Sequence, residues 1–250
     1  MIEFRHAAAG YGKEIILRDV TFTAPQGKLT ILLGPNGSGK TTLLKTAARQ
    51  LPLKQGEICI NGRSVSAYGR MEFARTAAFV PQSTIIPDIT VETLVCHGRF
   101  PYLGMSRTFR QCDRDAVEAA MSQMGIERWK DRNLKSLSGG ERQLAFLAMA
   151  LAQDTPVLLL DEPTAFLDVQ RQFQLIEKLH ALAAQGKTLI AVLHDLPGAL
   201  QYGDYLALLK DGCLQAAGTP EEIFESRKIS NLFGVEILRD ADRIYYLKKQ

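Results

Sequence analysis

The chain has 250 residues, of which 46% are apolar and 23% charged, as in an ordinary globular protein, and this length permits one large domain or two small ones. Its formal net charge of +3 is too small to indicate a nucleic-acid partner. No apolar run approaches the roughly 20 residues of a membrane-spanning helix, and the first residues lack the apolar core of a signal peptide. The four cysteines form no C-x-x-C pair, so we expect reduced thiols of a cytoplasmic protein.

The N-terminal segments predict antiparallel strands over residues 2–6, 15–17 and 20–22. Between the first two lies Tyr11, flanked by glycines. Its ring is either a surface side chain or a platform on which a purine could stack. The apolar, β-branched run 29–33 then predicts a buried strand.

A glycine-rich loop follows that strand and precedes a helix start, and it fits G-x-x-x-x-G-K-[ST] at every fixed position. Glycines let successive N–H groups point at an anion, and the helix N-terminus adds partial positive charge there. We expect Lys40 to reach the β- and γ-phosphates of a nucleotide and the Thr41 hydroxyl to bind Mg²⁺. The predicted phosphate loop consists of Gly34, Pro35, Asn36, Gly37, Ser38, Gly39, Lys40, Thr41 and Thr42.

The middle of the chain predicts strands over 57–60 and 77–80, separated by a turn at Asn61-Gly62. Gln82 follows the second strand, at the end where open α/β sheets bind ligands. Residues 83 to about 137 predict a helical insertion, with helices over 90–96 and 113–124.

Residues 137–141, Leu-Ser-Gly-Gly-Glu, predict the capped start of a helix. Ser138 and Glu141 fit a capping box, in which each side chain accepts from a backbone N–H group of the other residue. A well-capped helix would explain this pattern by itself. Gly139 and Gly140, however, leave the first turn without side chains, which suits an anion.

Two further strands end in polar residues. The apolar strand 157–160 leads into Asp161 and Glu162, and adjacent carboxylates beside a buried strand predict a cation. Asp161 suits Mg²⁺, and Glu162 suits the general base that polarises the attacking water. The strand 188–193 ends at His194, whose imidazole is either structural or a donor to a γ-phosphate.

The remaining residues predict a hairpin of 206–209 with 213–216 around Asp211-Gly212, and a helix start at 219–222. A last hairpin is expected from 235–238 and 243–247.

In the order and spacing of these motifs, the chain resembles the ATP-binding subunits of ABC transporters along essentially its whole length. Residues 137–141 resemble the signature of that family, which is more specific than the phosphate loop. By resemblance, Tyr11 stacks on adenine, and Gln82 touches Mg²⁺ and senses the γ-phosphate. Asp161, Glu162 and His194 correspond to the Mg²⁺-site aspartate, the catalytic glutamate and the switch histidine.

The resemblance implies an α/β P-loop NTPase (RecA-like) fold in a single ABC ATPase domain over 1–250. Its mainly parallel core carries an N-terminal antiparallel β-subdomain, together spanning about 1–82 and 138–250, and an α-helical subdomain is inserted at about 83–137. ATP and Mg²⁺ are the expected cofactors. Two subunits are expected to face each other head to tail, with each ATP between one phosphate loop and the partner's 138–141 segment. Asp168 belongs to the dimer-contact loop, where Ala165 departs from the usual serine.

Residues 98–104, Gly-Arg-Phe-Pro-Tyr-Leu-Gly, resemble a segment of importers for iron–siderophores, haem and cobalamin, although Tyr102 replaces the frequent histidine. This implies a peripheral subunit on the cytoplasmic face of the inner membrane, paired with a polytopic permease and served indirectly by a substrate-binding protein. The alternative is a soluble ABC-type ATPase of an assembly system such as iron–sulfur cluster biogenesis. A long coiled coil, as in DNA-repair ATPases, is excluded because residues 83–136 are too few and show no sustained heptads.

Overall fold

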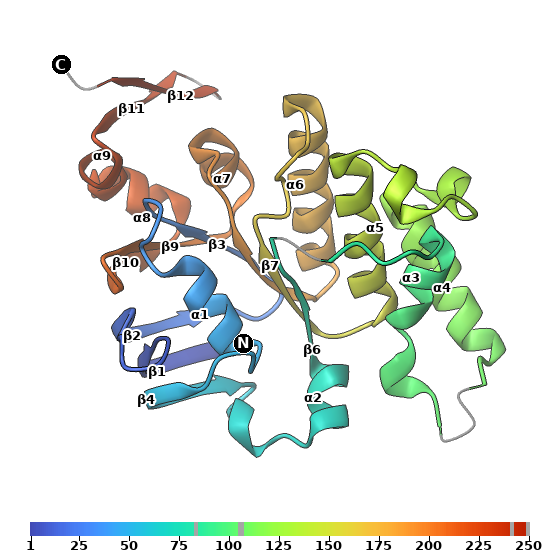
Figure 1. Cartoon of the computed structure of the whole chain (residues 1–250). Coiled ribbons are helices and arrows are strands. Elements are labelled where there is room, and N and C mark those ends of the chain that lie inside the picture. Colours follow the sequence, from blue (N-terminus) through green and yellow to red (C-terminus); the bar gives the residue numbers. More distant parts are fainter. Residues whose placement is uncertain (83–84, 105–107, 241–242, 249–250) are drawn as a thin grey trace. The chain divides into compact units, whose positions relative to one another are not determined.

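A computed structural model describes residues 1–82, 85–104, 108–240 and 243–248 (Figure 1). The chain forms two compact units. The first unit comprises Met1–Tyr68 and Phe173–Gln250, and the second unit comprises Gly69–Gln172. Within the described ranges, no helix is both long enough and apolar enough to cross a membrane.

The first unit begins with an antiparallel sheet, as predicted, but the segments expected as separate strands at 15–17 and 20–22 form one strand over Leu17–Ala24. Its strands lie in the order β2-β1-β4-β5. Phe4 of β1 and Phe22 of β2 stack with ring centroids 4.6 Å apart, so paired aromatic side chains help to fix the register. The turn at Asn61-Gly62 closes β4 onto β5 with positive φ angles of 50° and 79°. The strand bounds are β1 Ile2–Ala9, β2 Leu17–Ala24, β4 Leu53–Ile60 and β5 Arg63–Ser64.

A second sheet of the first unit places strands in the order β10-β9-β3-β8. β3 is parallel to both β8 and β9, and β10 closes antiparallel onto β9. Every residue of β3 and β8 is buried, which explains why each strand is apolar except for one threonine. Because β3 and β8 are parallel, their carboxyl ends share one edge of this sheet. The bounds are β3 Leu29–Leu33, β8 Thr188–Val192, β9 Tyr205–Lys210 and β10 Cys213–Gly218.

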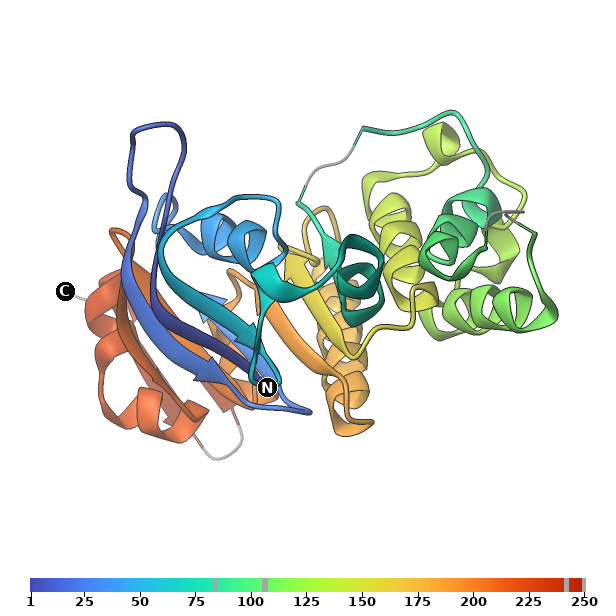
Figure 2. The ribbon, with the colours of Figure 1, turned by 90° about the horizontal axis from the view of Figure 1, so that it is seen from below.

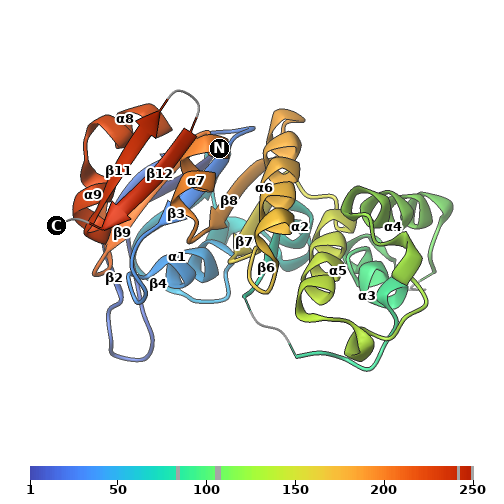
Figure 3. The ribbon, with the colours of Figure 1, turned by 90° about the horizontal axis from the view of Figure 1, so that it is seen from above.

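The helices of the first unit include α1 (Lys40–Ala47), α7 (Leu196–Tyr202), α8 (Pro220–Glu225) and α9 (Lys228–Phe233). A short 3-10 turn covers Val65–Ala67. The predicted helix start at Thr219 is confirmed, since its hydroxyl caps α8. The predicted last hairpin is also confirmed, as β11 (Val235–Asp240) and β12 (Arg243–Lys248), with β12 in contact with α7 (Figure 3).

Helix α6 (Val169–Ala184) begins in the second unit and ends in the first. The sequence analysis did not assign this helix. Its buried residues Leu175, Ile176, Leu179 and Leu182 nevertheless follow the spacing of an amphipathic helix. The spacing of these apolar residues is therefore sufficient to predict the helix from the sequence.

The second unit contains the parallel strand pair β6 (Ala77–Val80) and β7 (Val157–Asp161), together with several helices. Helices α3, α4 and α5 pack on one another. The predicted helices near 90–96 and 113–124 are confirmed. The latter starts two residues early, because Asp113 accepts from the Arg110 N–H group and so lies inside the first turn. The helix bounds are α2 Arg70–Thr76, α3 Val91–His97, α4 Gln111–Met124 and α5 Gly139–Ala152, with 3-10 turns at Phe100–Tyr102, Glu127–Trp129 and Leu134–Ser136.

The segment 98–104 gives this helical cluster a buried ion pair. The Arg99 guanidinium donates twice to one Asp113 oxygen, at 3.1 Å each, and once to the Ala152 carbonyl at 2.9 Å. The guanidinium also lies 4.1 Å from the centroid of the Tyr102 ring. Asp113 is fully buried, and its pKa is lowered because hydrogen bonds from Arg110 and Arg99 outweigh its burial. Arg99 therefore ties the end of α3 to the start of α4 and the end of α5.

Candidate functional site

The phosphate loop lies in the first unit between β3 and α1, and close packing or backbone conformation favours glycine at two of its positions. A Cβ atom on Gly34 would lie 2.2 Å from the Leu209 carbonyl oxygen. A Cβ atom on Gly39 would lie 2.7 Å from the Leu17 side chain, and Gly39 also has a φ of +99°. The loop is thus held directly against the end of β9 and the start of β2.

Lys40 is buried inside this loop, with only 5% of its surface exposed. Its ammonium group donates to the Gly34 carbonyl at 2.8 Å and to the Pro35 carbonyl at 2.9 Å. The helix it begins is preceded by Gly39, which has no side chain to cap the first N–H groups. A buried cation beside uncapped backbone donors is a site built for an anion. Among the other loop residues, Asn36 and Gly37 are exposed, Thr41 is half-buried, and Ser38 and Thr42 are buried.

Tyr11 lies in the long connection between β1 and β2, which extends away from the strands in Figure 2. Its side chain is 47% exposed, and its carbonyl accepts from the Glu14 N–H group at 2.9 Å, closing a turn. An exposed ring on a closed turn is accessible to a planar ligand. Its contact with adenine stays a prediction.

His194 is exposed and follows β8, so it leaves the sheet at the same edge as the phosphate loop after β3. Its neighbour Asp195 caps α7 by accepting from the Gly198 N–H group at 3.0 Å. Burial raises the pKa of Asp195. The cap fixes the backbone directly after His194, as a positioned imidazole would need.

In the second unit, parallel pairing of β6 and β7 brings Gln82 and Glu162 together, because each follows the carboxyl end of its strand. The Gln82 amide donates to a Glu162 carboxylate oxygen at 2.6 Å. Asp161 ends β7 and is 1% exposed. Glu162 has a φ of +51°, so strand geometry stops there and its side chain no longer follows the alternation of β7.

The start of α5 confirms the predicted capping box. The Ser138 hydroxyl accepts from the Glu141 N–H group at 3.3 Å, and the Glu141 carboxylate accepts from the Ser138 N–H group at 2.8 Å. The pKa of Glu141 is lowered, chiefly by this bond from the Ser138 backbone. Ser138 itself is exposed.

The two glycines after Ser138 make room for the loop after β7. A Cβ atom on Gly139 would lie 3.0 Å from Phe166 Cβ, and one on Gly140 would lie 2.9 Å from a Leu167 methyl group. Phe166 has a φ of +65° and remains 75% exposed. Two residues later, Asp168 accepts from the Arg171 N–H group at 2.9 Å, at the start of α6. The signature turn and the loop with Asp168 are therefore packed together within the second unit.

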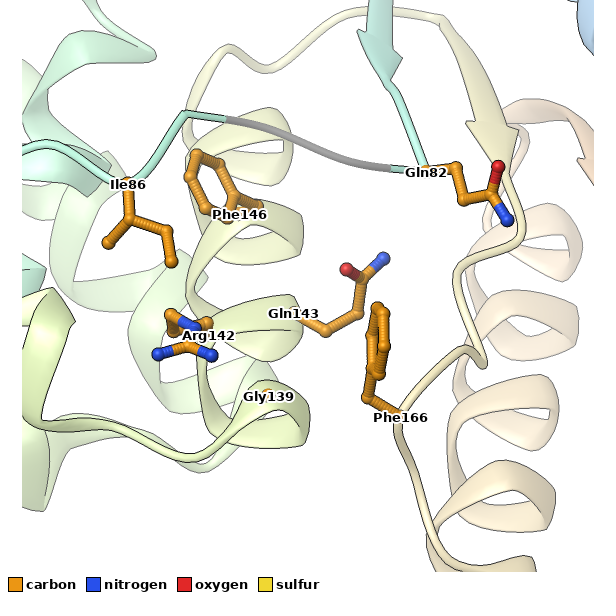
Figure 4. Close-up of a pocket in the computed structure, with 7 residues that line it drawn as sticks. All are labelled: Gln82, Ile86, Gly139, Arg142, Gln143, Phe146 and Phe166. Carbon is orange, nitrogen blue, oxygen red and sulfur yellow. The ribbon is translucent and has the colours of Figure 1, made fainter.

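A cavity of about 180 Å³ adjoins this packing (Figure 4). Gln143 is 6% exposed, and among the described residues its amide nitrogen has no hydrogen-bond partner. In Figure 4 this amide projects from α5 toward the side on which Gln82 and Phe166 lie. Because the Gln143 amide nitrogen is a buried donor without a partner among the described residues, this side of the cavity is polar. The lining residues are Gln82, Ile86, Gly139, Arg142, Gln143, Phe146 and Phe166.

The sequence analysis missed the cavity residues Gln143 and Phe166. Gln143 was detectable, because it is a polar residue on the buried face of α5 that also carries Phe146 and Ala150. Phe166 was not, because its exposure and backbone conformation depend on the approach of the signature glycines.

Comparison with known proteins agrees with these observations. The sequence model of the ABC transporter family matches residues 17–165. The ferric enterobactin transport ATP-binding protein FepC of Escherichia coli (strain K12) is 40% identical over 231 residues, which is 92% of this chain and 85% of that protein. The iron(3+)-hydroxamate import ATP-binding protein FhuC of Bacillus subtilis (strain 168) is 36% identical over 91% of this chain and 85% of that protein.

Solved structures show the same fold. The ATP-binding subunit of an ABC transporter superimposes with a TM-score of 0.79 at 26% identity, covering 94% of this chain and 95% of that one. A dimeric ATP-binding cassette with ADP and phosphate gives a TM-score of 0.78 at 26% identity, covering 88% of this chain and 99% of that one.

Fold and phosphate loop together define a P-loop nucleotide-binding protein, and the predicted α/β class is confirmed. The chain belongs to the ABC transporter family. It is an ATPase that binds ATP through its cassette.

Proposed function

We propose that this chain is the ATP-hydrolysing subunit of a bacterial importer for an iron(III)–siderophore complex or a related metal chelate such as haem or cobalamin. The observation that carries the proposal is the agreement among relatives that match nearly the whole chain. They are named for transport of ferric enterobactin, iron(3+)-hydroxamate, petrobactin, achromobactin and hemin, at 34–40% identity. The segment 98–104 supports the same class.

In this proposal the first unit binds the nucleotide. The loop N–H groups from Gly34 to Thr42 and the buried Lys40 ammonium hold the β- and γ-phosphates. Tyr11 offers its exposed ring to adenine, and His194 donates to the γ-phosphate. The position of Lys40 supports this role most directly, because its ammonium is buried within the loop, where it bonds the Gly34 and Pro35 carbonyls.

The second unit supplies the groups for hydrolysis. Glu162 is the general base that takes a proton from the attacking water, and Gln82 holds that carboxylate through the 2.6 Å hydrogen bond. The proposed Mg²⁺ ligands are Thr41 of the first unit and Gln82 and Asp161 of the second. All three offer oxygen, which Mg²⁺ selects, and Asp161 is a buried carboxylate that a cation would neutralise. When bound, Mg²⁺ would neutralise charge on the phosphates.

Assembly of two subunits completes the proposal. Ser138, Gly139, Gly140 and Glu141 of one copy face the nucleotide held by the phosphate loop of the other, and Asp168 lies at the dimer contact. The chain works peripherally on the cytoplasmic face of the inner membrane, where the helical subdomain of residues 83–137 couples it to a polytopic permease. A substrate-binding protein delivers the chelate, and no nucleic acid takes part.

A purification from membranes tests the proposal. We expect the tagged chain to co-purify with a polytopic permease. In proteoliposomes, a binding protein loaded with a ferric siderophore should stimulate ATP hydrolysis, and the Glu162→Gln complex should show no stimulation. Co-purification with a soluble iron–sulfur scaffold instead, without a permease, would favour the assembly ATPase and overturn the importer.

A further inference from the structure

The turn between β9 and β10 is wedged between the phosphate loop and the start of β2, all within the first unit. Its two central residues, Asp211 and Gly212, have φ angles of +49° and +77°. The Gly212 N–H group donates to the Ser38 carbonyl at 3.1 Å, and the Gly212 carbonyl accepts from the Arg18 N–H group at 2.8 Å. One peptide segment therefore bonds the phosphate loop on one side and β2 on the other.

No side chain fits at Gly212. A Cβ atom there would lie 1.7 Å from the Ile16 carbonyl oxygen, which is backbone and cannot rotate away. Gly39 of the phosphate loop faces the same turn, since its own Cβ atom would lie 3.7 Å from Gly212 Cα. The requirement for glycine at 212 thus arises from the backbone at Ile16 and Leu17, in addition to the turn conformation.

The hydrogen bond to Ser38 has a directional consequence. In a trans peptide the carbonyl of one residue and the N–H of the next point in opposite directions. Because the Ser38 carbonyl is held by Gly212, the Gly39 N–H group must point away from the hairpin. Gly39 is the N-cap of α1, where N–H groups face a bound anion.

We propose that Gly212 is a positioning residue for nucleotide binding: it fixes the Ser38–Gly39 peptide so that the Gly39 N–H group is presented to a phosphate. This inference rests on the proposed role of the phosphate loop. It adds a residue about 170 positions further along the chain, on a hairpin with no nucleotide-binding motif.

The chain offers a matched control for testing this role. Gly62 occupies the equivalent position of the Asn61-Gly62 turn, with a φ of +79°, and a Cβ atom there would meet nothing within 4 Å. Gly62→Ala and Gly212→Ala therefore introduce similar backbone strain, but only the second forces its turn away from the Ile16 backbone and so displaces the N–H group that bonds Ser38.

Titration calorimetry with ADP and ATP compares the two variants in the full chain. We expect Gly212→Ala to raise the Kd for both nucleotides by about tenfold or more, because a hydrogen bond to a charged phosphate is misdirected. Gly62→Ala should bind like the unmodified chain. In ¹⁵N-labelled protein, the Gly39 amide resonance should shift downfield on ADP addition in the control but less in Gly212→Ala. Equal affinities and equal shifts would overturn the proposal.

A measurement on the unmodified chain covers the case in which Gly212→Ala does not fold. Coupling is reciprocal, so if loss of the Gly212 bond weakens ADP binding tenfold, ADP must slow opening of that bond by about the same factor. We expect saturating ADP to slow hydrogen exchange of the Gly212 amide more than that of Gly186, which donates to Ala183 at 2.8 Å at the end of α6. Equal slowing of exchange at the Gly212 and Gly186 amides would contradict the proposed role of Gly212. Failure of the unmodified chain to bind ADP would instead refute the proposed function itself.

Discussion

Helices α1 and α5 both begin at glycine-rich turns, but they treat their first N–H groups differently. The N-cap of α1 is Gly39, and the first residue of the helix, Lys40, places a buried cation beside it. The N-cap of α5 is Ser138, which forms a reciprocal pair of hydrogen bonds with Glu141. The start of α1 therefore leaves its N–H groups available to a ligand, whereas at the start of α5 two N–H groups are already bonded by the side chains of Ser138 and Glu141.

This difference assigns different tasks to the two turns. The start of α1 can hold phosphate by itself, because cation and donors are in place before any partner arrives. The start of α5 is capped by its own residues and needs no ligand. Because the Glu141 carboxylate repels an anion, a phosphate at this turn must also be held by groups from elsewhere. We therefore expect changes in the first unit to alter nucleotide affinity, and changes in the second unit to alter turnover and assembly.

The largest expected effect concerns turnover in the second unit. Glu162→Gln should lower the rate of ATP hydrolysis by roughly 100-fold or more, because an amide cannot accept the proton from water. ATP affinity, measured by calorimetry, should stay within about threefold. Glu118→Gln, on the exposed face of α4, makes the same change of charge and serves as the control. Turnover unchanged in Glu162→Gln would remove this residue from the role of base.

Lys40→Ala should weaken ATP binding by the first unit. The variant loses a charge-assisted contact to phosphate, so we expect the Kd for ATP to rise by about tenfold or more. Lys45→Ala, one turn further along α1 and half-buried, controls for the loss of charge and helix stability. If both variants bound ATP equally, the buried ammonium would not be a phosphate ligand.

Ser138→Arg should separate assembly from binding. A long side chain at this exposed turn would occupy the space that the partner's nucleotide fills in the proposed dimer, and we expect dimerisation with ATP to weaken by about tenfold or more. ATP binding to the monomer should be unchanged. Light scattering distinguishes the monomer from the dimer, and a Glu162→Gln background keeps the ATP from being hydrolysed during the measurement. Ser122→Arg on α4 is the control. ATP-dependent dimers of Ser138→Arg would contradict the head-to-tail arrangement.

The smallest effect concerns the stability of the capped helix. Glu141→Ala should lower the free energy of unfolding by about 0.5–1 kcal/mol, the size of a lost cap. The pKa of Glu141 is lowered in the fold, so its contribution is present above the pKa of the unfolded chain and is lost as the pH falls through the folded value. Urea unfolding at neutral pH and in acid measures this difference. A destabilisation that persisted undiminished in acid would exclude a charged cap.

Much of the fold could be predicted because its signals are local. The buried strands β3, β7 and β8 are mostly apolar runs, and the caps at Ser138 and Thr219 are encoded within four residues. The turns at Asn61-Gly62 and Asp211-Gly212 require positive φ angles that these residue pairs tolerate. Helix α6 is absent from the predicted elements, although its apolar residues recur with the period of an amphipathic helix.

Other features depend on residues far apart in sequence. The contact of Gln82 with Glu162 exists because β6 and β7 are neighbours, and nothing near either residue encodes that pairing. The left-handed backbone of Phe166 arises where the loop meets Gly139 and Gly140. The burial of Asp113 follows from Arg99, which lies 14 residues away and on another helix end. Motifs predicted which residues matter here, but only packing shows how they are held.

Gly62 and Gly212 show how little dihedral angles alone reveal about tolerance to substitution. A mutational scan that scores each turn by its backbone conformation would assign the two glycines the same value. Behind Gly62 lies solvent, whereas behind Gly212 lies the carbonyl of Ile16. We therefore expect substitutions at Gly212, in the β9–β10 turn, to change nucleotide binding, although this turn lies outside every nucleotide-binding motif of the sequence.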